Sequence, residues 1–155
     1  MEIVNLILDL DGVLITTPPW KPDEIMEDNY SKFNEECVKN LNSLLSLFPT
    51  SIWLSSTRRL NKTVEEFNQI FQTRKIKNSI EGFLPNNTDL KTRKQEVESF
   101  IKQNNLKNYL IIDDDKSLNE LDSKIKKQLV QTTFLQGFNK EKLEESIKKL
   151  NTTQG

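Results

Sequence analysis

Three groups of polar residues follow apolar stretches in this sequence, and each contains side chains that could do chemistry. They are Asp9-Leu10-Asp11, Ser55-Ser56-Thr57-Arg58 and Asp113-Asp114-Asp115. Asp9 and Asp11 are two residues apart, so in an extended chain both carboxylates project to the same side. Gly12 then allows the backbone to turn tightly away from them. Clustered carboxylates repel one another or take up protons unless a cation compensates them, so these groups indicate a metal site.

The composition further restricts the catalytic mechanisms and metal sites that are possible, because the chain contains no histidine. This excludes histidine-based triads, histidine general bases and histidine-rich zinc sites. Oxygen ligands without histidine favour a hard ion, magnesium before zinc. The net charge of −1 does not single out a partner, whereas a dedicated nucleic-acid binder is more often strongly basic.

The single cysteine and the apolar segments allow a prediction of where in the cell the protein is found. Cys37 cannot form an internal disulfide, which favours a reducing, cytoplasmic setting. No apolar run approaches the ~20 residues needed to span a bilayer, so no membrane partner is expected. The N-terminal segment carries Glu2 and Asp9 and predicts a buried strand rather than a secretory signal.

Short apolar runs alternate with segments of helical periodicity along the chain. We predict strands at residues 3–8, 51–54, 80–84, 109–112 and 129–132, and helices at residues 26–48, 61–73, from 92 onward, 117–126 and 140–150. This alternation implies parallel pairing through right-handed crossovers. The expected fold is α/β, a doubly wound, Rossmann-like parallel sheet with helices on both faces, in one domain over residues 1–155. The polar groups would then meet at the carboxyl edge of the sheet.

Each polar group also has an ordinary structural interpretation. Aspartates at strand ends often cap a turn, and Asp113 to Asp115 taken singly would cap the helix near Ser117. Arg58 and Arg59 are more often solvated surface residues, and Trp53 is expected in the core. The conjunction favours a site, because a fold that loses stability by clustering acids does so for function.

In this order the motifs resemble the haloacid dehalogenase (HAD) superfamily of phosphohydrolases. LILDLDGVL matches the first motif of that family, Ile52-Trp53-Leu54-Ser55 the second, and Tyr109 to Asp114 the fourth. The third motif is a lysine that opens a helix, for which Lys94 is the best match, with Arg93 and Lys91 as alternatives. The strings IWLSSTR, YLIIDDDKSL and LVQTT further resemble the small HAD domains associated with RNA-repair proteins.

The resemblance implies a division of catalytic roles between the first two aspartates. Asp9 would be the nucleophile and form an aspartyl-phosphate, and Asp11 would protonate the leaving oxygen and then activate water. Magnesium would be held by Asp9, the backbone carbonyl of Asp11 and Asp114, with Asp113 close by.

The resemblance also implies the groups that bind the phosphoryl oxygens and the substrate. Ser55 and Lys94 would bind the transferring phosphoryl group. Ser56, Arg58 and Arg93 are the candidates for contacts to the rest of the substrate.

The segments between the motifs are too short for a large cap domain, so the site is expected to be open. Open sites in relatives suit bulky substrates, which favours a phosphomonoesterase acting on nucleic-acid or nucleotide ends. A phosphatase of a small metabolite is one alternative. A catalytically silent HAD module used for binding is another, although the presence of both Asp9 and Asp11 argues against it.

Overall fold

Five short, mostly apolar runs form one parallel sheet in the computed structural model, which describes residues 2–154. The strands are β1 (Val4–Leu8), β2 (Thr50–Leu54), β3 (Ile80–Phe83), β4 (Tyr109–Asp113) and β5 (Leu129–Gln131), and their spatial order is β3-β2-β1-β4-β5. The chain runs from β1 outward to β2 and β3, and then returns to the other side of β1 for β4 and β5. The strand order therefore reverses at β1, and the predicted α/β, doubly wound fold is confirmed.

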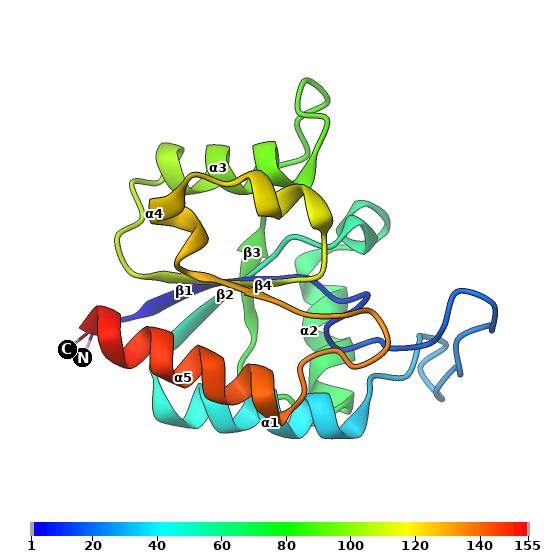
Figure 1. The fold of residues 1–155 in the computed structure, drawn as a ribbon. Coiled ribbons are helices and arrows are strands. Elements are labelled where there is room, and N and C mark those ends of the chain that lie inside the picture. The colour runs from blue at the N-terminus through cyan, green and yellow to red at the C-terminus, as the bar shows by residue number, and fades with distance from the viewer. Residues whose placement is uncertain (1, 155) are drawn as a thin grey trace.

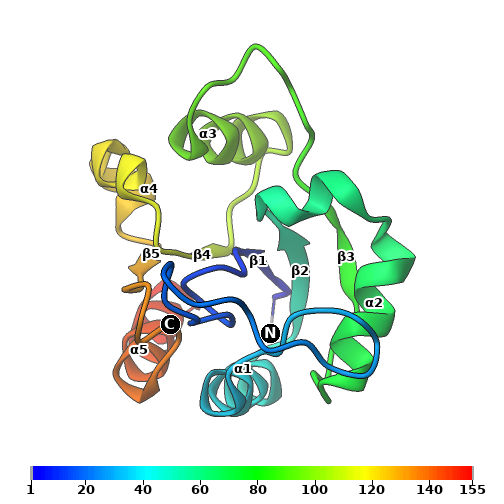
Figure 2. The same ribbon diagram turned by 90° about the vertical axis from the view of Figure 1, so that its right-hand side faces the viewer.

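Helices cover both faces of the sheet (Figures 1 and 2). They are α1 (Glu35–Leu47), α2 (Val64–Thr73), α3 (Arg93–Gln103), α4 (Ser123–Lys126) and α5 (Lys140–Gln154), with 3-10 turns η1 (Thr57–Asn61) and η2 (Lys116–Glu120). One core joins alternate residues of β1, Leu6 and Leu8, to α1, α2 and α5. A second core joins Ile7 to α3, η2 and α4. The alternation of a strand buried on both faces explains the continuous apolar run of β1.

Three predicted helices differ from the observed ones because local caps decide where helices begin. The segment predicted as helix from residue 26 is irregular as far as Asn34, whose side chain accepts a hydrogen bond from the Cys37 N–H and starts α1. The helix predicted from residue 61 begins at Val64, because Thr63 and Glu66 form a capping box. The helix predicted over 117–126 is divided into η2, capped by Asp115, and α4, capped by Asp122.

Trp53 was expected in the core and lies only partly buried on the α3 face. Its indole Nε1 donates to Asn5 Oδ1 at 3.0 Å, and its ring packs against the Phe100 ring with the two ring centres 5.3 Å apart.

Within residues 2–154, the connections between the strands and helices contain no separate cap domain. In the same range, no helix combines the length and apolar character required to cross a bilayer.

Candidate active site

The parallel strands bring the predicted polar groups to one edge of the sheet, on the right of Figure 1 and facing the viewer in Figure 2. Asp9 and Ser55 directly follow β1 and β2, and Asp113 is the last residue of β4. Backbone hydrogen bonds continue the ladder through them: Asp9 N–H donates to the Ile112 carbonyl at 3.1 Å and Ser55 N–H to the Leu8 carbonyl at 2.9 Å. The side chains at these strand ends are therefore held by the sheet itself.

Three carboxylates converge at this edge. Asp9, Asp113 and Asp114 each offer one oxygen, and these oxygens lie within 4.8 Å of one another. Asp9 and Asp113 are buried and Asp114 is half-buried. Burial and the neighbouring charge of Asp113 raise the pKa of Asp9 well above its usual range, and the same causes raise the pKa of Asp114 to about 6. Such a set of oxygen donors under mutual repulsion fits a hard divalent cation such as magnesium.

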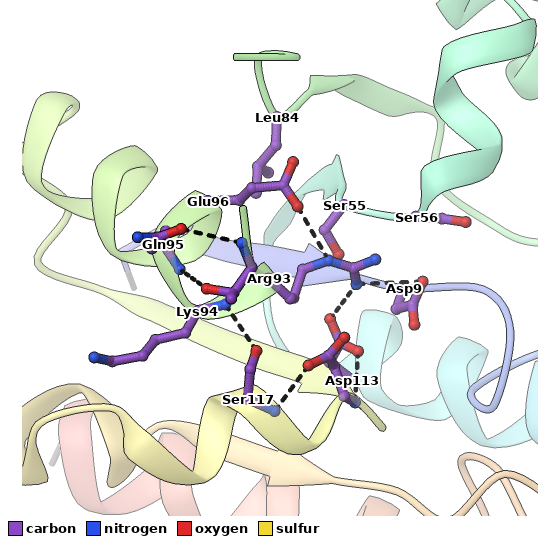
Figure 3. Close-up of polar contacts among 12 residues, drawn as sticks. Asp9, Ser55, Ser56, Leu84, Arg93, Lys94, Gln95, Glu96, Asp113 and Ser117 are labelled. Carbon is purple, nitrogen blue, oxygen red and sulfur yellow. Dashed lines mark hydrogen bonds and ion pairs between the residues drawn. The ribbon is translucent and has the colours of Figure 1, made fainter. Parts of the chain in front are cut away.

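Arg93 lies among these acids (Figure 3). Its Nη1 is 2.6 Å from Asp113 Oδ2 and 3.5 Å from Asp9 Oδ1, and its Nε is 3.4 Å from Glu96 Oε1. The side chain is 8% exposed, so the contacts with Asp9 and Asp113 are little screened by solvent. Thr92 caps α3 through a capping box with Gln95, which fixes Arg93 as the first residue of the helix.

The other two candidates for the third motif lie outside the acid cluster. The Lys94 ammonium is 3.9 Å from Glu98, and its side chain points away from the site in Figure 3. Lys91 is exposed and its Nζ donates to the Thr88 carbonyl. The sequence did carry a signal for Arg93. It precedes Val97, Phe100 and Ile101 by four, seven and eight residues, the spacing of one helix face.

Ser55 brings a buried hydroxyl to the same place. Its side chain is fully buried, and its Oγ has no hydrogen-bond partner among residues 2–154. Arg93 Nε likewise has no hydrogen bond within this range. Figure 3 shows the Ser55 side chain pointing toward the Arg93 guanidinium. Buried polar atoms are almost always hydrogen-bonded, and Arg93 Nε has at least its ion pair with Glu96 at 3.4 Å. The Ser55 hydroxyl beside the acid cluster has no partner among the described residues, so it indicates a place for a ligand with acceptor oxygens.

Ser56 has a structural contact instead. Its Oγ accepts a hydrogen bond from the Arg58 N–H at 3.2 Å and caps η1.

Asp11 is not part of the three-acid cluster and pairs with Arg58. Arg58 Nε is 2.7 Å from Asp11 Oδ2, and Nη2 is 2.9 Å from Asp11 Oδ1. The same guanidinium donates to Asp23 Oδ2 at 3.0 Å and to Ser31 Oγ at 3.2 Å. Asp23 and Ser31 belong to the irregular segment before α1, and no sequence signal placed them here.

Gly12 allows the turn after β1 to approach Asp114. Its φ is +80°, and a Cβ at this position would collide with Asp114 Oδ2. The Thr132 hydroxyl donates to the Gly12 carbonyl at 2.6 Å and ties this turn to the end of β5. The role of Thr132 was not predicted from the sequence.

Arg59 was expected at the surface but is buried. Its guanidinium donates to the carbonyls of Leu84, Ser55 and Ser56, and forms an ion pair with Glu96. Because Glu96 also lies close to Arg93, Arg59 helps to position Arg93 through Glu96.

Comparison with known proteins identifies the family. Residues 5–143 match the family described as the HAD domain in Swiss Army Knife RNA repair proteins. No curated protein matches the chain. The matched range includes every residue of the site described above, from Asp9 to Thr132. The chain therefore belongs to the HAD domains of Swiss Army Knife RNA repair proteins.

Proposed function

We propose that this chain is a magnesium-dependent phosphomonoesterase that uses Asp9 as its nucleophile. One observation carries the proposal: the unpartnered Ser55 hydroxyl and the Arg93 guanidinium lie beside a buried carboxylate that has two further acids next to it. This arrangement offers donors for phosphoryl oxygens, a nucleophile and metal ligands in one place. Membership of the HAD family supports the same chemistry.

In the first step an Asp9 oxygen attacks phosphorus, and the bond from phosphorus to the leaving oxygen breaks. The leaving oxygen takes a proton from Asp11, and an aspartyl-phosphate remains on Asp9. In the second step water attacks the same phosphorus, Asp11 accepts its proton, and inorganic phosphate leaves with Asp9 restored.

Arg58 holds Asp11 before these proton transfers. Asp11 faces Arg58 in the described conformation, and its side chain is 38% exposed. Proton transfer therefore requires the carboxyl group to turn from Arg58 toward Asp9. The side chains of Asp11 and Arg58 are both partly exposed.

Ser55 and Arg93 bind the phosphoryl group. The Ser55 hydroxyl and the Arg93 guanidinium donate to its oxygens, while Arg93 Nη1 keeps Asp113 in place at 2.6 Å. Donors fixed where charge develops stabilise the transition state most when they are shielded from water. We therefore assign the third-motif role to Arg93 in place of Lys94 or Lys91.

Asp9, Asp113 and Asp114 would hold the metal. The donor set fits magnesium, since all three ligands are carboxylates. Burial and the charge of Asp113 raise the pKa of Asp9 and of Asp114, and a cation would offset this repulsion. The ion would neutralise phosphoryl charge and help to align attack.

The substrate we propose is the phosphorylated end of a nucleic acid or a nucleotide. The described chain has no cap domain over the site, and the family is described from RNA repair proteins. A small metabolite phosphate would need closer enclosure for selectivity than this open edge offers.

Hydrolysis of an aryl phosphate with and without magnesium tests the proposed reaction. Activity that depends on magnesium and is lost with EDTA supports it, and a rate unaffected by EDTA contradicts the metal assignment. A screen of oligonucleotides phosphorylated at the 3′ or 5′ end, nucleotides, sugar phosphates and phosphopeptides would then rank substrates by kcat/KM. A higher kcat/KM for sugar phosphates would contradict the nucleic-acid assignment.

A further inference from the structure

The segment between β1 and α1 carries a large aromatic side chain in solvent. Trp20 is 73% exposed, and its segment, blue in Figure 1, projects beyond the carboxyl edge of the sheet. Single exposed apolar residues are common, but an exposed tryptophan beside a catalytic edge has a large surface available for a ligand.

The segment is tied to the candidate active site. Asp23 Oδ2 accepts hydrogen bonds from Ser31 Oγ at 2.6 Å and from Arg58 Nη2 at 3.0 Å. Because the same guanidinium binds Asp11, the segment and the candidate proton donor share one anchor. Trp20 is three residues from Asp23, a reach of about 11 Å at most.

A second anchor fixes the far side of the segment. The buried Arg74 guanidinium pairs with Asp28 at 2.6 Å and donates to the carbonyls of Tyr30 and Ser31. Prolines at positions 18, 19 and 22 flank Trp20 and restrict φ there. Lys21 N–H closes a turn onto the Pro18 carbonyl at 3.0 Å. Ordering Trp20 against a ligand therefore costs less entropy than ordering a flexible loop.

Lys21 and Lys62 beside this segment are available to the phosphates of a ligand, next to the segment's own acids Asp23, Glu24, Glu27 and Asp28. Arg58 is partly exposed and lies 5.5 Å from the centre of the Tyr30 ring, and the Lys62 ammonium lies 5.4 Å from it. Lys21 is exposed next to Trp20. Cations together with an exposed aromatic face are what single-stranded nucleic acids require, since phosphates contact the cations and bases stack on the ring.

We propose that Trp20 is a stacking platform for a nucleobase at the phosphorylated end of a nucleic-acid strand. The proposal rests on the proposed phosphatase function and makes it more specific: the terminal base, as well as the phosphate, is recognised. Trp20 acts in substrate binding and has no part in the chemical steps.

Kinetics with matched oligonucleotides test this specificity. Two oligonucleotides share a terminal phosphate, and one lacks the base of the terminal nucleotide; versions phosphorylated at the 3′ and at the 5′ end are compared. We expect wild type to favour the base-bearing substrate at one of the two ends by about tenfold in kcat/KM. Trp20→Ala should lose this preference and Trp20→Phe should keep most of it. Equal kcat/KM for intact and abasic substrates of wild type at both ends would overturn the proposal.

The control for removing an exposed apolar side chain is Leu47→Ala. Leu47 is 52% exposed and ends α1, so it lies toward the amino edge of the sheet, away from the site. Its substitution should leave the preference for the base-bearing substrate unchanged.

A binding measurement separates this proposal from the fate of the phosphatase assignment. Asp9→Asn protein is titrated with the base-bearing oligonucleotide while tryptophan fluorescence is recorded, and Asp9→Asn/Trp20→Phe protein supplies the Trp53 signal for subtraction. Saturable quenching of Trp20 supports stacking even if no phosphatase activity is found. Absence of saturable binding, or binding without a change at Trp20, overturns the proposal and would favour a protein partner for this segment.

Discussion

Two arginines with buried side chains, Arg74 and Arg93, contact aspartates in different regions of the molecule, and their hydrogen bonds differ. Every nitrogen of the Arg74 guanidinium has a partner, either Asp28, Thr73 or a backbone carbonyl. Arg93 pairs with Asp113 and approaches Asp9, yet within residues 2–154 its Nε has no hydrogen bond and only the looser ion pair with Glu96 at 3.4 Å. An arginine whose nitrogens are all hydrogen-bonded stabilises the fold, whereas an arginine with a nitrogen that lacks a hydrogen bond, beside several acids, is placed to bind a ligand.

The acids in the two regions differ in the same way. Hydrogen bonds from Arg74 lower the pKa of Asp28 to about 2, so the fold there favours the charged carboxylate. Burial and Asp113 raise the pKa of Asp114 to about 6, so the metal-free site disfavours charge. Arg59 belongs with Arg74, because its nitrogens are all bonded to carbonyls or to Glu96. We use these contrasts to predict which substitutions damage the fold and which damage the site.

Replacing Arg74 should have the largest effect on stability. Arg74→Met leaves Asp28 and the carbonyls of Tyr30 and Ser31 without their donor, which should cost about 3–5 kcal/mol of unfolding free energy. Urea denaturation measures this loss. A variant as stable as wild type would show that Arg74 is not structural.

Replacing Arg93 should instead reduce turnover. Arg93→Met should lower kcat by about 10²–10³-fold, because a donor to the transferring phosphoryl group is lost. Arg93→Lys should retain part of the rate, and Lys94→Met is the matched control that should change it little. If Lys94→Met were the more damaging change, the assignment of the third motif to Arg93 would be wrong.

Gly12→Ala should weaken the site from the backbone side. The new Cβ would collide with the Asp114 carboxylate, and φ of +80° is strained for alanine, so we expect about 1–2 kcal/mol of lost stability and weaker magnesium binding. Denaturation and calorimetry measure the two effects. Alanine at Gly82, which has no such φ and faces the Trp53 ring, should leave metal affinity unchanged.

The pH dependence of stability should distinguish the two kinds of aspartate with smaller effects. In EDTA, Asp114 is ionised at pH 7 in both the folded and the unfolded state, and its negative charge destabilises the folded state. Between about pH 6 and 4 the folded state binds the extra proton, so this contribution makes stability rise as the pH falls. Asp114→Asn should raise the melting temperature at pH 7 and lose that advantage toward pH 4.

The Asp28 contribution has the opposite sign. It is present above about pH 4, where the unfolded carboxyl ionises, and is lost as the pH falls through about 2. Asp28→Asn should therefore lower the melting temperature at pH 7, and the difference should disappear in strong acid. If the melting temperatures of the Asp28 and Asp114 variants, each relative to wild type, changed with pH in the same way, the distinction between the two regions would be wrong.

The elements that position Asp9, Ser55 and Asp113 could be predicted because these residues stand at strand ends. A continuous apolar run followed by Asp9, Ser55 or Asp113 implies a buried parallel strand, and parallel strands bring their carboxyl ends to one edge. The choice between the adjacent residues Arg93 and Lys94 depends on how α3 is rotated about its own axis. The positions of its core residues indicate this rotation, but they distinguish two neighbouring positions only by a small margin.

The contacts of Arg58 could not be predicted. Asp23 and Ser31 lie in an irregular segment without periodicity, and their approach to Arg58 depends on the tertiary fold. The same holds for Arg59, because burial of an arginine depends on carbonyls of Leu84, Ser55 and Ser56 that no local pattern reveals.

The most direct test of the central claim is to identify the phosphorylated residue during turnover. The protein is mixed with a labelled phosphomonoester and magnesium, quenched in acid, and digested for mass spectrometry. The proposed mechanism predicts label on the Asp9 carboxylate in wild type, and neither label nor turnover in Asp9→Asn, since an amide is a far poorer nucleophile. Label on another residue, or a folded Asp9→Asn protein with near-normal activity, would contradict it.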